Sequence, residues 1–169
     1  MRKKARYLTQ CGTIAALYVA LTYLQNILLP GTASMAIQFR AAEALCVLAF
    51  FTPAAIPGLS LGCLLFNLSY AQALPLDFLI GTAATLLSTA FMWKSRQVCI
   101  KGYPLVGLLM PALWNGVLVG WELSLYVGGG FLVNALLVAA GELGVLLTLG
   151  SGLYYGIKLR KLDKKLFRQ

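Results

Sequence analysis

The stretch QFRAAEALCVLAFFTPAAIPGLSLGCLLFNL, residues 38–68, decides the fold of this chain. It is almost entirely apolar, yet Arg40 and Glu43 stand one helical turn apart near its start, and Pro53 and Pro57 follow a few residues later. The prolines predict a turn between two short helices, because proline interrupts one helix and fits the first position of the next. A charged pair at the mouth of an apolar run is not typical of a soluble core.

The composition of the whole chain predicts an integral membrane protein. Hydrophobic residues make up 60% of the 169 positions and charged residues only 11%. Several apolar runs approach 20 residues, the length that crosses a bilayer as a helix, and a small soluble core cannot enclose so much apolar surface. The net charge of +9 comes mainly from Arg2 to Arg6 and from Lys158 to Arg168. Basic ends of this kind are typical of anchoring at the cytoplasmic side of a bilayer, so we expect a lipid partner and no nucleic acid.

Apolar runs and helix breakers predict an all-α bundle of six transmembrane helices that forms a single domain over residues 1–169. The predicted spans are approximately 8–29, 40–52, 57–70, 77–93, 104–122 and 131–157. A segment as short as 40–52 reaches roughly 20 Å as an α-helix. The second and third spans therefore either cross the bilayer or form a re-entrant hairpin around the turn at 52–57.

Three basic clusters predict the orientation of the bundle. They are the N-terminal segment, the loop that contains Lys94, Arg96 and Lys101, and the C-terminal tail. The positive-inside rule places all three in the cytoplasm, and an even number of predicted crossings separates each pair. Both termini are therefore expected on the cytoplasmic side.

The intramembrane charges predict a ligand pocket that opens outward. In this orientation Arg40, Glu43, Asp77 and Glu122 lie toward the outer ends of their spans, and Glu142 lies deeper. A charge at the centre of a helix in the bilayer costs about 2.5–3.5 kcal/mol on insertion scales, so these groups should face a cavity or one another. A structural ion pair is the alternative for Arg40 with Glu43, and helix capping is the alternative for Asp77.

Polar and aromatic residues at helical spacing from the acids extend this predicted pocket. Asn115 shares a stripe with Glu122, beside Trp114 and Trp121. Aromatic walls suit a flat heterocycle, although Trp121 is equally compatible with an interfacial aromatic belt. The predicted substrate-binding residues are Glu142, Glu122, Trp121, Asn115, Trp114, Asn134, Asp77, Arg40, Glu43, Asn67 and Tyr70.

The first predicted span has two different sides. Small residues recur at four-residue spacing, at Gly12, Ala16 and Ala20. The opposite side is polar and carries Tyr18, Thr22 and Gln25. We expect the polar side to face the bundle interior. The small-residue side lets another helix approach closely, either within the bundle or in a partner protein.

Little in the sequence points to catalysis. The chain has no histidine, and its four cysteines lack metal-type spacing. The nucleotide-binding motif G-x-x-x-x-G-K-[ST] is absent from the sequence. We expect no enzymatic activity and no cofactor or metal held by this chain.

Three motifs resemble one family of membrane proteins. They are FRAAEAL at 39–45, FFTPAAIPGLSLGCLLFN at 50–67 and LDFLIGTAATLL at 76–87. They resemble the QueT family, which comprises substrate-binding S components of energy-coupling factor (ECF) transporters linked to queuosine-precursor uptake. The three motifs cover about half of the chain.

The resemblance implies a six-helix S component in a bacterial plasma membrane. Its implied partners are a membrane T component and two cytoplasmic ABC-type ATPases, which would use the ATP. Ala16 and Ala20 match the alanine-x-x-x-alanine motif with which S components dock on the T component. The implied substrate is a 7-deazaguanine, either 7-aminomethyl-7-deazaguanine or queuine. The alternatives are an S component for another vitamin-like compound and a stand-alone cation-coupled carrier.

Overall fold

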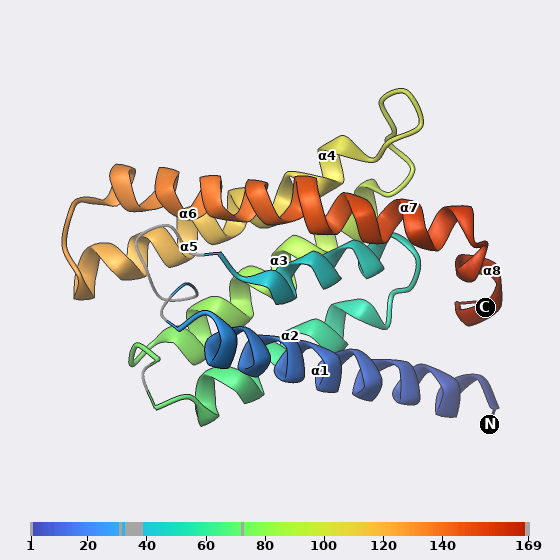
Figure 1. Ribbon diagram of the computed structural model, residues 1–169, viewed down its shortest axis with the longest axis horizontal. Coiled ribbons are helices and arrows are strands. Elements are labelled where there is room, and N and C mark those ends of the chain that lie inside the picture. The colour runs from blue at the N-terminus through green and yellow to red at the C-terminus, as the bar shows by residue number, and fades with distance from the viewer. Residues whose placement is uncertain (1, 31, 33–38, 72, 168–169) are drawn as a thin grey trace.

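The computed structural model of the chain describes residues 2–30, 32, 39–71 and 73–167. These residues fold into a helical bundle (Figure 1). In chain order the helices are α1 (Arg2–Leu28), η1 (Ala41–Phe50), α2 (Ala55–Ser69), α3 (Asp77–Ser95), α4 (Leu105–Leu108), α5 (Met110–Tyr126), α6 (Phe131–Val145), η2 (Leu146–Gly150), α7 (Ser151–Leu159) and α8 (Leu162–Leu166).

Both ends of the chain lie at the same end of the bundle, which also carries the η1–α2 turn and the α3–α4 loop (Figure 1). The opposite end carries the α2–α3 and α5–α6 turns. This arrangement agrees with the predicted even number of passes between the three basic clusters. The placement of the termini in the cytoplasm stays a prediction, and Arg168 of the basic tail lies outside the described residues.

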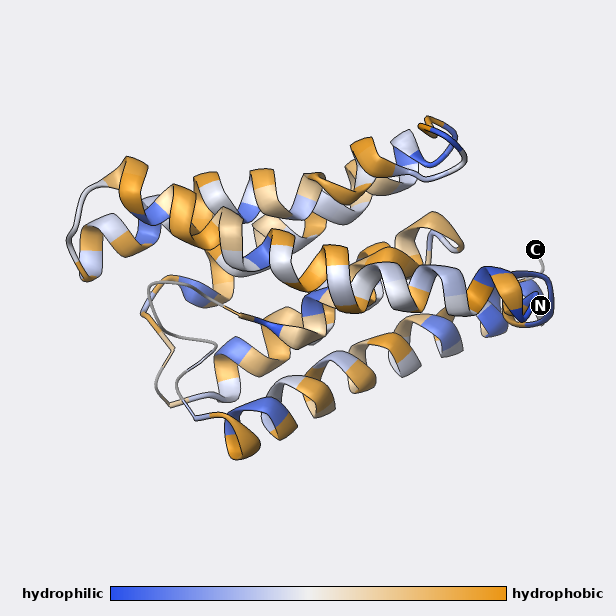
Figure 2. Cartoon of the chain, turned by 45° about the horizontal axis from the view of Figure 1, so that its top comes forward, coloured by the Kyte–Doolittle hydropathy of each residue, from blue (hydrophilic) through white to orange (hydrophobic). Residues whose placement is uncertain are grey.

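Three stretches of the described residues are long and apolar enough to cross a bilayer as helices. They are Lys3–Leu28, Leu105–Tyr126 and Phe131–Leu159. Figure 2 shows hydrophilic residues gathered near the chain ends and in the loops, with a few inside the bundle. Two of the other predicted spans correspond to η1 and α2, which are shorter apolar helices, and the third corresponds to α3. The count of six crossings therefore stays a prediction.

The second predicted span is a 3₁₀-helix over Ala41–Phe50 and not an α-helix over 40–52. A 3₁₀-helix rises about 2.0 Å per residue, so its ten residues extend about 20 Å instead of about 15 Å. Stretches of this length are uncommon, because 3₁₀ hydrogen bonds have poorer geometry than those of the α-helix. Every residue from Ala42 to Phe50 is buried, so the surrounding helices hold η1 from all sides.

The last two predicted spans also contain irregular turns. Leu109 separates α4 from α5, and Pro111 lies in the first turn of α5, which continues beyond the predicted limit of 122 to Tyr126. The final span runs from α6 through the π-helical turn η2 into α7. At this turn the Ser151 Oγ donates a hydrogen bond of 3.1 Å to the Leu146 carbonyl oxygen, five residues earlier.

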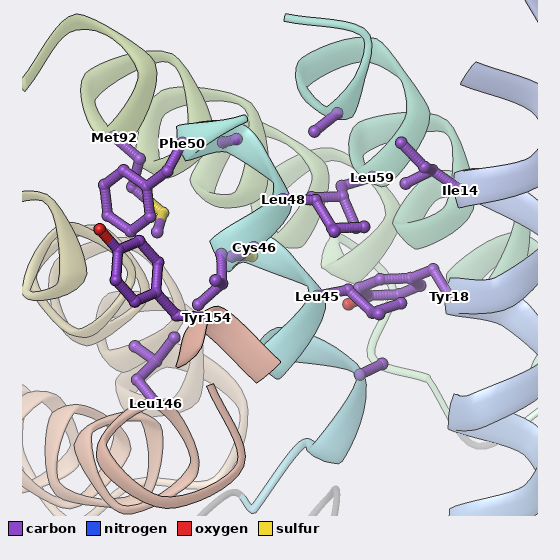
Figure 3. Close-up of a cluster of buried hydrophobic side chains, with 14 of the residues drawn as sticks. Ile14, Tyr18, Leu45, Cys46, Leu48, Phe50, Leu59, Met92, Leu146 and Tyr154 are labelled. Carbon is purple, nitrogen blue, oxygen red and sulfur yellow. The ribbon is translucent and has the colours of Figure 1, made fainter. Parts of the chain in front are cut away.

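The main hydrophobic core surrounds η1. Figure 3 shows the η1 side chains of Leu45, Cys46, Leu48 and Phe50 among buried residues from the neighbouring helices. Those neighbours include Ile14, Tyr18, Leu59, Met92, Leu146 and Tyr154. A second, smaller cluster joins α3, α5 and α6 through Ala84, Val119, Leu123 and Val138. The short central helix is therefore the element around which the other helices are arranged.

Glycines bring two pairs of helices into close contact. A Cβ atom on Gly62 of α2 would lie 2.7 Å from the Cβ of Tyr18 in α1, and one on Gly120 of α5 would lie 2.6 Å from the Cα of Ala135 in α6. Any side chain larger than hydrogen would force these helices apart. Small residues at helix interfaces allow the close packing on which membrane bundles depend.

Candidate functional site

Arg40 and Asp77 form a buried ion pair between η1 and α3. Arg40 directly precedes η1, and its Nη2 lies 3.7 Å from the Asp77 Oδ1. Both side chains are buried. Asp77 stands in the first turn of α3, where the positive end of the helix dipole favours an acid, while Leu76 occupies the N-cap position. Arg40 therefore joins two helices, whereas the sequence-based alternative paired it with Glu43.

Glu43 has partners of its own inside the core. The Tyr18 hydroxyl donates a 2.7 Å hydrogen bond to Oε1, and the Cys46 thiol donates a 3.1 Å bond to Oε2. Side chains three residues apart lie directly above one another in a 3₁₀-helix, which brings Cys46 over Glu43. Glu43 is 1% exposed. Both of its oxygens are thus satisfied by α1 and η1.

Glu122 and Glu142 are buried without such partners. Glu122 is 0% exposed, and neither of its carboxylate oxygens has a hydrogen-bond partner among the described residues. Glu142 is 1% exposed, and its Oε2 likewise has no partner in that part of the chain. The same holds for the Nε1 of Trp114 and the Nδ2 of Asn115 on α5. Buried polar atoms are normally paired, so these atoms on α5 and α6 require hydrogen-bond partners that the described residues do not supply.

The charges of the bundle interior act on one another. Glu122 interacts electrostatically with Asp77 and Arg40, and Glu142 interacts with Glu43 and Arg40. The structure therefore brings together Arg40, Glu43, Asp77, Glu122 and Glu142, which we call the buried charge cluster. It contains four of the five acidic residues of the chain around one guanidinium. An excess of acid in this cluster favours a cationic ligand or one rich in N–H donors.

The predicted asparagines take different places around this cluster. Asn67 is buried, and its Nδ2 donates a 2.8 Å hydrogen bond to the Asp77 carbonyl oxygen, which joins α2 to α3 beside the ion pair. Asn115 is buried on α5, on the side of Glu122. The Nδ2 of Asn134 donates a 2.7 Å bond to the Gly128 carbonyl oxygen and so fastens the α5–α6 turn.

The predicted aromatic walls are only partly present. Trp114 is half-buried and its ring packs at 5.5 Å, centroid to centroid, on Phe91 of α3. Tyr70, just beyond α2, stacks on Phe66 with the ring centroids 5.1 Å apart. Trp121 is 47% exposed, whereas its neighbour Glu122 is fully buried. The structure therefore places Trp121 on the outside of the bundle, as the interfacial-belt alternative requires, and not in the buried charge cluster.

Comparison with known proteins identifies the family. The family model described as "QueT transporter" matches residues 8–159, a range that contains every member of the buried charge cluster. The chain belongs to the QueT transporter family. No curated protein and no solved structure gives a match. Its apolar helices and its membership of the QueT family identify the chain as a membrane protein with a transport role.

Two polar residues of this QueT family member were not predicted as part of the site. Tyr18 was expected only to face the interior, yet it is a direct partner of Glu43. The Gln25 Oε1 accepts a 2.7 Å hydrogen bond from the Ala41 backbone N–H, and its Nε2 donates to the Phe39 carbonyl oxygen. Gln25 thereby fixes the start of η1 beside Arg40. The polar character of Tyr18 and Gln25 in an otherwise apolar helix is visible in the sequence. Their hydrogen-bond partners could not be predicted from it.

The two sides of α1 have the orientation that the sequence indicates. Tyr18, Thr22 and Gln25 are buried. Gly12, Ala16 and Ala20 are exposed, and no other atom lies within 4 Å of a Cβ built on Gly12. This exposed row is called the small-residue stripe below. In contrast, Gly58 and Gly62 of α2 pack on the buried side of α1, as expected of internal packing residues.

Proposed function

We propose that this QueT family member is the substrate-binding S component of an ECF-type importer, and that it captures a cationic 7-deazaguanine at the buried charge cluster. The observation that carries the proposal is the pair of buried carboxyl groups on neighbouring helices, Glu122 and Glu142, that keep unpaired oxygens beside the Arg40–Asp77 ion pair. Such atoms are costly in an empty bundle, and a ligand with matching donors would recover that cost.

The guanine edge of the ligand matches Glu122. A 7-deazaguanine keeps the ring N–H and the exocyclic amine of guanine side by side, and a carboxylate accepts such a pair of donors in bidentate fashion. Both oxygens of Glu122 have no partner among the described residues and are available for this contact. We therefore assign the guanine edge to Glu122.

The remaining unpaired groups suit the rest of the ligand. The aminomethyl side chain is a cation, and the Oε2 of Glu142 is an unpaired acceptor in the same cluster. Two unpaired donors on α5, Trp114 Nε1 and Asn115 Nδ2, suit the carbonyl oxygen of the ring. In this assignment Glu43 and the Arg40–Asp77 pair hold the helices around the ligand.

Partner proteins complete the proposed importer. The chain lacks a nucleotide-binding motif, so the proposal assigns ATP hydrolysis to two ABC-type ATPases and the connection with them to a T component. The small-residue stripe of α1 supports the position of that contact, because it is exposed and bears no bulky side chain. Docking there would leave the buried charge cluster, on the opposite side of α1, free to hold the ligand.

A binding panel on the purified protein tests this function. The ligands are 7-aminomethyl-7-deazaguanine, queuine, the uncharged 7-cyano-7-deazaguanine, guanine, thiamine, riboflavin and biotin, measured by calorimetry. We expect the two cationic deazaguanines to bind most tightly and Glu122→Gln and Glu142→Gln to weaken them. Asp163→Asn is the matched control, because Asp163 is the one acid outside the cluster. Tight binding of an unrelated vitamin would overturn the proposal. So would Glu122→Gln and Glu142→Gln variants that bind the deazaguanines as tightly as the unmodified protein does.

A further inference from the structure

A groove lies between α1, η1, α7 and α8, and none of its lining residues belongs to the buried charge cluster. This groove has a volume of about 400 Å³. Its lining is mainly apolar and includes Ile14, Leu17, Leu45, Leu48, Leu153 and Ile157. Three polar side chains, those of Thr9, Gln10 and Thr13, contribute to one wall. Figure 3 shows Leu45 and Leu48 of η1 on the side that faces Ile14 of α1.

One end of this groove is closed by α8, which folds back toward the start of α1. The Nη2 of Arg6 and the Nε2 of Gln10 both donate hydrogen bonds to the Leu166 carbonyl oxygen, at 3.0 and 2.9 Å. Leu162 and Leu166 of α8 themselves line the groove. The closed end is the end of the bundle where both chain termini lie (Figure 1).

Exposed positive charges surround this closed end. The Arg6 guanidinium is hydrogen-bonded to the Leu166 carbonyl oxygen. Lys161 and Lys165 directly precede the groove residues Leu162 and Leu166. All three basic side chains are exposed. Lys161 directly precedes α8, and Lys165 lies in its last turn. The groove is thus apolar along its length and has basic side chains around one end, an arrangement that suits an amphiphile with a negative head.

We propose that this groove binds one anionic phospholipid of the inner leaflet. An acyl chain lies along the leucines of α1 and η1, and the phosphate lies beside Arg6, Lys161 and Lys165. A bound lipid would fill the space between α1 and α7 and fasten the terminal helices to each other. This site is independent of the transported substrate, because it shares no residue with the buried charge cluster.

Native mass spectrometry of the full-length protein tests the site. The delipidated protein is titrated with phosphatidylglycerol and with phosphatidylcholine that carry identical acyl chains. We expect one phosphatidylglycerol to be retained in preference to phosphatidylcholine. Replacing both lysines, Lys161→Gln with Lys165→Gln, should weaken that binding roughly ten- to thirty-fold, because each basic residue near a membrane surface contributes modestly to the binding of anionic lipid.

Two further variants separate this site from general surface charge. Lys94→Gln with Lys101→Gln removes the same charge from the α3–α4 region at the same end of the bundle and should leave the binding unchanged. Thr13→Trp fills the groove from the exposed side of α1 and should abolish retention while the protein stays folded. Equal retention of the two lipids, an equal loss in the control pair, or full binding by Thr13→Trp would overturn the proposal.

Discussion

Glu43 and Glu122 are two buried carboxyl groups of the same charge cluster with opposite surroundings. Glu43 on η1 has a hydrogen-bond donor for each oxygen, from Tyr18 and Cys46. Glu122 on α5 has none among the described residues. The difference separates a completed half of the cluster, formed by α1 and η1, from an incomplete half on α5 and α6. The first half holds the helices together, and the second is where our proposal places the ligand.

This difference has an energetic meaning. A buried polar group without a partner costs about 1–3 kcal/mol, and more when it is charged. Residues kept for binding commonly lower the stability of the empty protein, so stability and affinity should respond in opposite directions when such a residue is replaced. The two glutamates therefore provide a direct comparison in which both quantities are measured on the same variants.

The largest expected effect is on ligand affinity in Glu122→Gln. The amide keeps one acceptor oxygen but turns a donor group toward the N–H donors of the ligand. Losing a charged, bidentate contact should weaken the binding of 7-aminomethyl-7-deazaguanine about 100-fold by calorimetry. The thermal unfolding temperature of the empty protein should stay the same or rise. A lower unfolding temperature with unchanged affinity would remove the distinction between the two glutamates.

The next effect is on stability in Glu43→Ala. This change leaves the Tyr18 hydroxyl and the Cys46 thiol without their acceptor inside the core. We expect the free energy of unfolding in detergent to fall by about 2 kcal/mol. Glu122→Ala serves as the comparison, and its free energy of unfolding should fall much less. Equal losses in the two variants would mean that the hydrogen bonds of Glu43 do not hold the helices together.

A smaller effect is expected from Tyr18→Phe, which removes one donor and keeps the buried ring. The loss of a single side-chain hydrogen bond between helices should lower the unfolding free energy by about 1 kcal/mol. Tyr155→Phe is the matched control, because Tyr155 lies on α7 with 49% of its surface exposed. The control should be neutral, and a neutral Tyr18→Phe would contradict the role given to the Tyr18–Glu43 bond.

The smallest effect on the isolated protein is expected in the small-residue stripe. Ala16→Leu with Ala20→Leu should change the unfolding free energy by less than about 0.5 kcal/mol, because both side chains point away from the bundle. Ligand binding should also persist. Copurification with the T component and the ATPases should be lost, whereas Ala83→Leu, at an exposed alanine of α3, should retain it. If the complex still forms with the stripe filled, the docking surface lies elsewhere.

Much of the fold could be predicted from the composition of the chain and the spacing of its apolar residues. The apolar runs locate the helices because a helix in a bilayer must be apolar over most of its length, and this condition leaves a clear pattern. The cost of an isolated charge in such surroundings also explains why the gathering of Arg40, Asp77, Glu122 and Glu142 was predictable. The two sides of α1 followed from helical periodicity alone.

Other features depend on contacts between segments that lie far apart in the sequence. Arg40 and Glu43 are three residues apart, a spacing that fits an ion pair. In the structure Arg40 instead pairs with Asp77 of α3, and Glu43 accepts a hydrogen bond from Tyr18 of α1. The 3₁₀ form of η1 could not be predicted, because nine consecutive buried residues show no polar side from which a helical period can be counted. The sequence left two positions open for Trp121, because aromatic residues suit a pocket and the membrane surface equally well, and in the structure its side chain is 47% exposed.

The three-residue turn of η1 also fixes its length. Each residue of a 3₁₀-helix rotates the chain by about 120°, so side chains stand in three straight columns. One column holds Glu43 and Cys46, and all positions from Ala42 to Phe50 are enclosed. Inserting one residue after Glu43 would shift every later side chain into the wrong column at once. A lipid-facing helix tolerates such a change far better, so the enclosed η1 is a segment in which an insertion or deletion of one residue should be strongly destabilising.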